Sequence, residues 1–350
     1  MSSGDRSHKA TPKDIRISRR TLGIAAIGLT ATAVFSPYVK PARSAEFTLK
    51  LANGYLPQHP LNLQLKTSLE AIAQETNGRV DIKLFPQSQL GADADLISQV
   101  RSGALDFYAT DGLVMSSLIP VAALSNVPFA FADYAHGWDA VDHGVGEEIH
   151  SAFDNVGLHA FDRPYDNGIR HLTTSRKQVS TAQDVQGMKL RVPVSPILVS
   201  LFKNLGVTPV PMNVAELYSA LQTGLVDGQE NPLVVISTLK LNEVQKYCAL
   251  TGHLWGAIWI SANKDRWNSL PSDVKAVISK HINDGAIQQR QASADKAKSL
   301  RGELETAGLI FNDPNLDSFR LKLRESGFYT EWREKFGAKA WAALEKYASL

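Results

Sequence analysis

Residues 187–232 read GMKLRVPVSPILVSLFKNLGVTPVPMNVAELYSALQTGLVDGQENP. The β-compatible residues at 188–192 predict a short strand, which Pro193 ends. Arg191 lies at the carboxyl end of that strand, and ligands of open α/β sheets bind outside the carboxyl ends of strands. The position makes Arg191 a candidate ligand contact, and the alternative is an ordinary surface charge.

A repeating order of strand and helix continues from there. A helix is predicted over 195–205, a strand over 207–210 and a second helix over 213–223. The short connections predict a right-handed parallel β-α-β-α unit. Two acids and two amides beside a glycine and a proline then predict a polar turn over 227–232.

Four sequence patterns in this segment carry a family resemblance. They are Gly-x-Lys-x-Arg-Val-Pro at 187–193, Leu-Gly-x-x-Pro-x-Pro-Met at 205–212, Glu-x-Tyr-x-Ala-Leu-Gln-Thr-Gly at 216–224 and Val-Asp-Gly-Gln-Glu-Asn-Pro at 226–232. The chain resembles the extracytoplasmic solute-binding proteins of TRAP transporters, of the DctP type, over roughly residues 46–345.

The resemblance implies a two-lobed α/β periplasmic binding protein of the Venus-flytrap kind, with one long helix spanning both lobes. The expected lobes are residues 46–168 plus about 257–296, and residues 169–256 plus about 297–350. Such a protein is not an enzyme and needs no cofactor. It captures a small organic acid in the periplasm and delivers it to DctQ-type and DctM-type membrane subunits.

The resemblance also implies roles for particular residues. Arg191 would pair bidentately with the ligand carboxylate, because guanidinium and carboxylate match in planar geometry. Arg170 matches a second arginine of the family and would contact the carboxylate or a neighbouring oxygen. Asn231 would hydrogen-bond the carboxylate, and Met212 and Val214 would shape the pocket wall.

Five further residues are candidates for the variable end of the site, which sets ligand identity: Tyr55, His59, Asp93, His253 and Trp255. His59 fits equally well as a donor that stabilises its loop, and Trp255 fits equally well as hinge packing. A sugar acid, a C4-dicarboxylate, a hydroxy- or keto-monocarboxylate and an aromatic acid all fit an arginine site. The tryptophans and tyrosines favour sugar acids slightly, because they can stack on a sugar ring.

The amino-terminal part of the mature chain follows the same alternation. Strands are predicted over 47–51, 80–85 and 105–109, and helices over 61–76 and 92–102. This β-α-β-α-β order predicts a parallel, doubly wound lobe.

Other segments give less regular expectations. The sequence predicts one helix over 135–155, a turn at 165–168, a helix over 239–246 and two helices within 317–350. A proline-free stretch ending near residue 307 predicts a long helix with a charged, solvated centre.

Histidine and cysteine do not predict a metal site. His136, His143 and His150 are spaced seven residues apart, and seven residues of helix rise about 10 Å, whereas zinc ligands lie about 2 Å from the metal. Cys248 is the only cysteine, so it has no internal disulfide partner, and its apolar neighbours predict a buried packing position.

Residues 1–45 predict a signal peptide. A basic region precedes a weakly apolar run over 21–35, and Arg19-Arg20 resembles a twin-arginine signal, which is favoured over general export. A retained membrane anchor is the alternative, but a span needs roughly 20 residues. The segment holds 8 of the 37 basic and 2 of the 35 acidic residues, so the mature chain carries 29 and 33, a net charge of −4. That charge removes any argument for nucleic-acid binding.

No nucleophile elbow, phosphate-binding loop or dinucleotide-binding glycine motif occurs in the sequence. Two alternatives to a transport receptor stay open at this stage. One is a secreted α/β enzyme that acts on an organic acid with a carboxylate base, and the other is a ligand sensor subunit.

Overall fold

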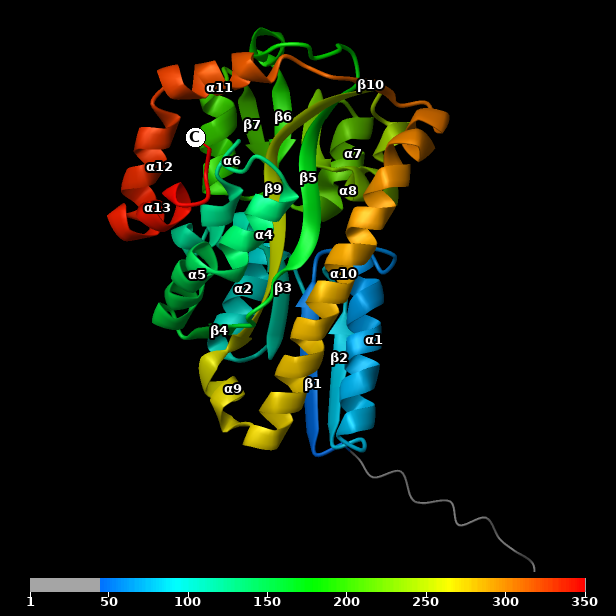
Figure 1. The fold of residues 1–350 in the computed structure, drawn as a ribbon. Helices are drawn as coiled ribbons and strands as arrows, with labels where there is room; N and C mark the ends of the chain where they lie inside the picture. Colours follow the sequence, from blue (N-terminus) through cyan, green and yellow to red (C-terminus); the bar gives the residue numbers. More distant parts are fainter. Residues whose placement is uncertain (1–44, 350) are drawn as a thin grey trace, which may run out of the picture. The chain divides into compact units, whose positions relative to one another are not determined.

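The structure is a computed structural model, and it describes residues 45–349 (Figure 1). The predicted signal peptide lies almost wholly outside these residues. The described chain contains a ten-stranded sheet whose main path runs β2-β1-β3-β9-β5-β8-β6-β7, with β4 and β10 pairing with β9 off this path. The strands are β1 Phe47–Asn53, β2 Val80–Phe85, β3 Phe107–Asp111, β4 Leu158–Ala160, β5 Tyr165–Thr174, β6 Lys189–Val192, β7 Thr208–Pro211, β8 Gly228–Pro232, β9 Tyr247–Asn263 and β10 Ile310–Asn312.

Helices cover the sheet. The α-helices are α1 Pro60–Glu75, α2 Asp93–Ser102, α3 Gly112–Met115, α4 Tyr134–Asp142, α5 Gly144–Asn155, α6 Pro196–Asn204, α7 Leu217–Gln222, α8 Leu233–Thr238, α9 Lys264–Ser269, α10 Ser272–Thr306, α11 Leu316–Glu325, α12 Phe328–Phe336 and α13 Ala338–Glu345. Short 3-10 turns are η1 Pro120–Asn126, η2 Ala182–Val185, η3 Val214–Glu216 and η4 Leu241–Glu243. None of the helices in the described part is long and apolar enough to cross a membrane.

The sheet has two parallel ends joined by two long strands. β1 pairs in parallel with β2 and β3, and we call this end and its helices the β1 side. β6 pairs in parallel with β7 and β8, and this end is the β6 side. Both parallel units were predicted and are confirmed. β9 pairs antiparallel with β3 through its carboxyl end and with β5 through most of its length, so β5 and β9 connect the two sides.

The long helix α10 also connects the two sides (Figure 1). Val274, Ile278 and Ile282 recur every four residues and therefore form one apolar stripe, which packs against α1 in a shared core. Near the other end of α10, Leu304 belongs to a separate core that includes Leu217 of the β6 side. The predicted long helix that spans both sides is confirmed.

The predicted polar turn at 227–232 is wrong. Gly228–Pro232 forms strand β8, which lies between β5 and β6 and is buried at every residue. Its polar side chains are buried because neighbouring strands supply their partners. The Gln229 side-chain amide donates to the Thr173 hydroxyl at 2.8 Å, and the Glu230 carboxylate binds Arg170. Buried polar groups with such partners are tolerated inside a sheet.

The predicted turn at 165–168 is also wrong, because these residues belong to strand β5. The pairing of β5 with β9 is irregular between Asp166 and Gly168. Gly168 has a φ of +103°, a conformation that residues with a side chain rarely adopt. The turn-forming residues therefore produce a bulge within the strand instead of ending it.

Several helix predictions need correction. The helix expected over 135–155 is divided into α4 and α5 at His143, and Gly146 in the second helix approaches the Val141 carbonyl so closely that a side chain would not fit. The one expected over 213–223 is divided into η3 and α7. Residues 239–246 form only the short turn η4, since Lys240 adopts a left-handed conformation after α8. The tail contains three helices instead of two.

Candidate functional site

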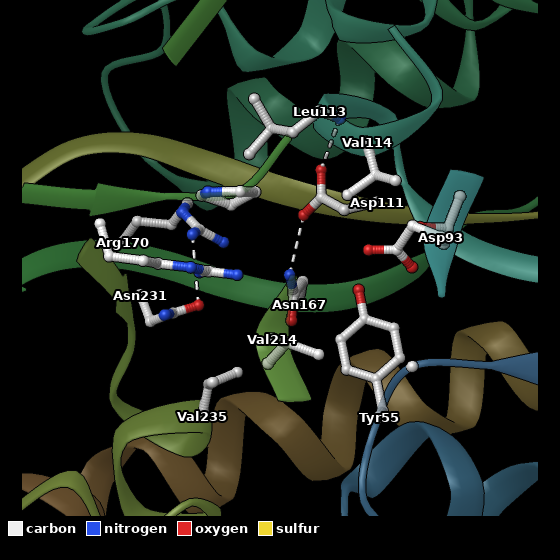
Figure 2. Close-up of a pocket in the computed structure, with 14 residues that line it drawn as sticks. Tyr55, Asp93, Asp111, Leu113, Val114, Asn167, Arg170, Val214, Asn231 and Val235 are labelled. Carbon is white, nitrogen blue, oxygen red and sulfur yellow. Dashed lines mark hydrogen bonds between the residues drawn. The ribbon is translucent and has the colours of Figure 1, made fainter. Parts of the chain in front are cut away.

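A cavity lies between the two sides of the sheet, next to the crossing strand β5 (Figure 2). The β1 side contributes the loop after β1, the start of α2 and the end of β3. The β6 side contributes β6, β8, η3 and α8, and the connecting strand β5 contributes Asn167 and Arg170. The lining residues are Gly54, Tyr55, Asp93, Thr110, Asp111, Leu113, Val114, Asn167, Arg170, Arg191, Pro193, Val214, Asn231 and Val235.

Arg191 is the buried cation of the cavity that lacks a carboxylate partner within residues 45–349. It lies on the short strand β6, which Pro193 follows, and only 2% of it is exposed. Its Nε and Nη2 atoms both donate to the carbonyl oxygen of Met212, at 3.0 and 2.7 Å. Burial lowers its pKa to about 10, so the guanidinium is protonated at neutral pH. A buried, unpaired charge is costly, and an anion in the cavity would offset that cost.

Arg170, in contrast, already has a counter-charge. It lies on β5, and its Nε and Nη2 atoms donate to the two carboxylate oxygens of Glu230 on β8 at 2.5 and 2.6 Å. Nη2 also contacts the Asn231 side-chain oxygen at 3.2 Å. Burial opposes the charged form, but the Glu230 carboxylate outweighs it, and the pKa of Arg170 is raised. The pair therefore brings no net charge to the cavity.

The β1 side presents two acids to the same cavity. Asp93 begins α2 and accepts a hydrogen bond from the Tyr108 hydroxyl at 2.8 Å. Asp111 ends β3 and accepts from the Leu113 main-chain N–H at 3.0 Å and from the Asn167 side-chain amide at 2.8 Å. Burial raises the pKa of both carboxyls. Neither forms a salt bridge within the described chain, so the two walls of the cavity differ in charge.

These observations lead to the comparison with known proteins. The sequence model of the bacterial extracellular solute-binding proteins, family 7 (DctP), matches residues 53–331. The chain belongs to this family. The predicted family is confirmed.

This chain is similar in sequence to two further proteins and in fold to a solved structure. An uncharacterized protein of Sinorhizobium fredii is 38% identical over 280 residues, which cover 80% of this chain and 51% of that protein, so the chain spans about half of that relative. The 2,3-diketo-L-gulonate-binding periplasmic protein YiaO of Escherichia coli is 32% identical, covering 84% of this chain and 88% of that protein. The crystal structure of a TRAP periplasmic solute-binding protein from Roseobacter denitrificans with bound β-D-glucuronate has a TM-score of 0.81 and 27% identity, covering 86% and 98% of the two chains. The predicted two-lobed α/β fold is thereby confirmed.

Six of the ten residues predicted for the site of this DctP-family chain line the cavity. They are Tyr55, Asp93, Arg170, Arg191, Val214 and Asn231. Met212 lies behind the cavity and holds Arg191 through its main-chain oxygen.

The other three predicted residues contact neighbours outside the cavity lining. His59 is the N-cap of α1, where its Nδ1 accepts from the Leu61 main-chain N–H at 3.2 Å. His253 lies 3.2 Å from the Glu230 carboxylate, and the Trp255 indole donates to Asp166 at 2.9 Å. Trp255 packs in an edge-to-face manner on Trp138 of α4 and is not among the residues that line the cavity.

The sequence analysis missed Asp111 and Asn167. The sequence did contain a signal for Asp111. This residue follows the predicted third strand, and ligands of open α/β sheets bind outside the carboxyl ends of strands, which is the rule that was applied to Arg191. Asn167 gave no such signal, since it was assigned to a turn and its position depends on the bulge in β5. No cluster of three or more potential metal ligands occurs among residues 45–349, and His136 and His143 are exposed beside aspartates.

Proposed function

We propose that this protein is the extracytoplasmic receptor of a TRAP transporter and that it binds a small organic acid through an arginine–carboxylate clamp. The observation that carries the proposal is Arg191, a buried guanidinium that faces the cavity and forms no salt bridge with any carboxylate among residues 45–349. Guanidinium groups bind carboxylates through two parallel, charge-assisted hydrogen bonds. A ligand carboxylate would supply the missing counter-charge.

The neighbouring residues complete the clamp. Arg170 is fixed by Glu230, so that its unoccupied Nη1 is available to a ligand oxygen. Asn231 is fixed between Arg170 and Gln229, and its amide would donate a further hydrogen bond to the carboxylate. Val214 and Val235 cover the ligand from the β6 side. A site that is held in place before binding loses little conformational entropy when the ligand arrives.

We propose that binding involves closure of two lobes, residues 46–168 plus about 257–296 and residues 169–256 plus about 297–350. Three connections support this division, namely β5, β9 and α10, because each of them runs from one proposed lobe into the other. Contacts across the cavity are sparse. The Gln58 side chain donates to the Thr238 carbonyl at 3.4 Å, and the Ser116 and Ser195 hydroxyls lie 3.5 Å apart. These two weak contacts can break and reform during a hinge closure.

The receptor would act in the periplasm after export through the signal peptide at residues 1–45. It would deliver the acid to DctQ-type and DctM-type membrane subunits. The TRAP and periplasmic assignments of its relatives support both steps.

The test is a thermal-shift screen of the purified protein against organic acids, followed by calorimetric titration of each acid that binds. Arg191→Lys keeps the charge but loses the planar fork, and we expect it to weaken binding at least tenfold. Arg176→Lys, at an exposed arginine of the β6 side, is the matched control and should bind as the wild type does. Equal affinity of Arg191→Lys and wild type would refute the clamp.

A further inference from the structure

We infer that this cavity selects monocarboxylic acids that carry hydroxyl groups and rejects dicarboxylic acids, and that Asp93 is a specificity-determining residue. The inference rests on the proposed function, since it takes Arg191 as the partner of the ligand carboxylate. It goes further by assigning a role to the opposite wall of the cavity.

Two arginines line the cavity, and Arg170 is already paired with Glu230 through two short hydrogen bonds. Arg191 is therefore the one cavity cation without a counter-ion in the part of the chain that the structure describes. One unpaired cation matches one ligand carboxylate. A second carboxylate on the same ligand would find no cation of its own.

A second carboxylate on the ligand would lie near the acids on the opposite wall of the cavity. Figure 2 shows Asp93 and Tyr55 on the opposite side of the cavity from Arg170 and Asn231, with Asp111 between them. Neither Asp93 nor Asp111 has a cationic partner among the described residues. A ligand anchored by its carboxylate at Arg191 would direct its far end toward these acids. A second carboxylate buried beside these acids would have no cation to offset its charge, so it is disfavoured there.

Two hydrogen-bond acceptors of the cavity, on Asp93 of α2 and Asn167 of β5, lack donors among residues 45–349. Asp93 uses one carboxylate oxygen to accept from Tyr108 and has no donor for the other within residues 45–349. The side-chain oxygen of Asn167 is buried and has no donor in the same residues. Unsatisfied acceptors favour a ligand that brings donors, and hydroxyl groups are donors whereas carboxylates are not. A site built to bind a ligand hydroxyl rejects an analogue that lacks it.

The experiment compares acids that differ at one end only. Gluconate and glucarate, and likewise erythronate and meso-tartrate, differ by a CH2OH group in place of a second carboxylate. Calorimetric titration of the purified protein should give at least tenfold tighter binding of the monocarboxylate in at least one pair. Asp93→Asn keeps an acceptor for Tyr108 but removes the charge, and it should reduce that preference at least threefold. Asp265→Asn, at an exposed aspartate of α9, removes the same charge away from the cavity and should leave the preference unchanged.

The outcomes separate this inference from the proposed function. Equal or tighter binding of the dicarboxylates, with Arg191→Lys weakening it, would overturn the inference and leave the clamp intact. Binding of only keto or aromatic acids, again dependent on Arg191, would do the same. A preference for the monocarboxylate that Asp93→Asn leaves unchanged would remove the role of Asp93. Failure of every acid in the screen to bind would overturn the proposed function and the inference together.

Discussion

The buried ion pair between Arg170 and Glu230 should contribute strongly to the free energy of unfolding, and a single substitution can test this. Both side chains are almost completely buried, and two hydrogen bonds of 2.5 and 2.6 Å join them. Glu230→Gln preserves the size of the side chain but leaves the guanidinium without its counter-charge. Removing one partner of a buried pair typically costs about 3–5 kcal/mol. Because Gln keeps one acceptor and Arg170 keeps its bond to the Glu230 main-chain oxygen, we expect the low end, about 3 kcal/mol.

Equilibrium unfolding in urea measures this loss. The midpoint should fall while the dependence on denaturant stays the same, since the surface exposed on unfolding does not change. Glu305→Gln is the control, because Glu305 pairs with Arg301 on the exposed face of α10 at 3.0 Å. Exposed pairs of this kind contribute little, so this variant should unfold at nearly the wild-type urea concentration. A loss below about 1 kcal/mol for Glu230→Gln would refute the view that Glu230 neutralises a buried cation.

Further predictions concern other parts of the chain. Burial lowers the pKa of His59 to about 3, whereas an unfolded histidine has a pKa of roughly 6.5. Between these two values the unfolded chain binds a proton that the folded chain does not bind. The free energy of unfolding should therefore decrease by about 2 kcal/mol as the pH falls from 7 to 5. His59→Asn still offers a cap acceptor to the Leu61 main-chain N–H and should lose less stability between pH 7 and pH 5, as measured by urea titration. An unchanged loss would contradict the view that His59 is responsible for the pH dependence. In α10, Gly285→Ala should destabilise by about 1–3 kcal/mol, because the new methyl would lie 2.3 Å from the Ser68 hydroxyl oxygen. The methyl group of Gly302→Ala on the same helix meets nothing within 4 Å, so this variant should stabilise the protein by about 0.5–1 kcal/mol. Thermal melts in which both variants shift the melting temperature in the same direction would contradict the close packing of Gly285 against Ser68. Cys248 is fully buried and its pKa is raised to about 12, so a thiol reagent should label it only after unfolding, and rapid labelling of the native protein would contradict its burial.

Elements with a strong local pattern could be predicted from the sequence. Strand β2 was predicted with its observed bounds, Val80–Phe85, because β-branched and apolar residues alternate with polar ones between clear turn signals. The long helix α10 could be predicted because its apolar residues repeat every four positions and no proline interrupts them. In both cases the local preference and the final packing agree.

Elements whose structure depends on distant partners could not be predicted. Strand β8 contains Gly, Gln, Glu, Asn and Pro, which are typical of turns, and it becomes a buried strand because Arg170, 60 residues earlier, neutralises Glu230. The site was only partly predicted for the same reason, because its residues come from segments that are far apart in the sequence. Arg191 and Asp93 were predicted as candidates separately, but the sequence could not indicate that they face one cavity with opposite charge.

The crystal structure of the protein with the acid that gives the largest thermal shift would test the central claim most directly. The account predicts that the ligand lies between the β1 and β6 sides and that its carboxylate forms a bidentate pair with the Arg191 guanidinium. It also predicts that Arg170 stays paired with Glu230 when the ligand binds. A ligand carboxylate bound away from Arg191, or an Arg191 paired with Asp93 instead, would contradict the account.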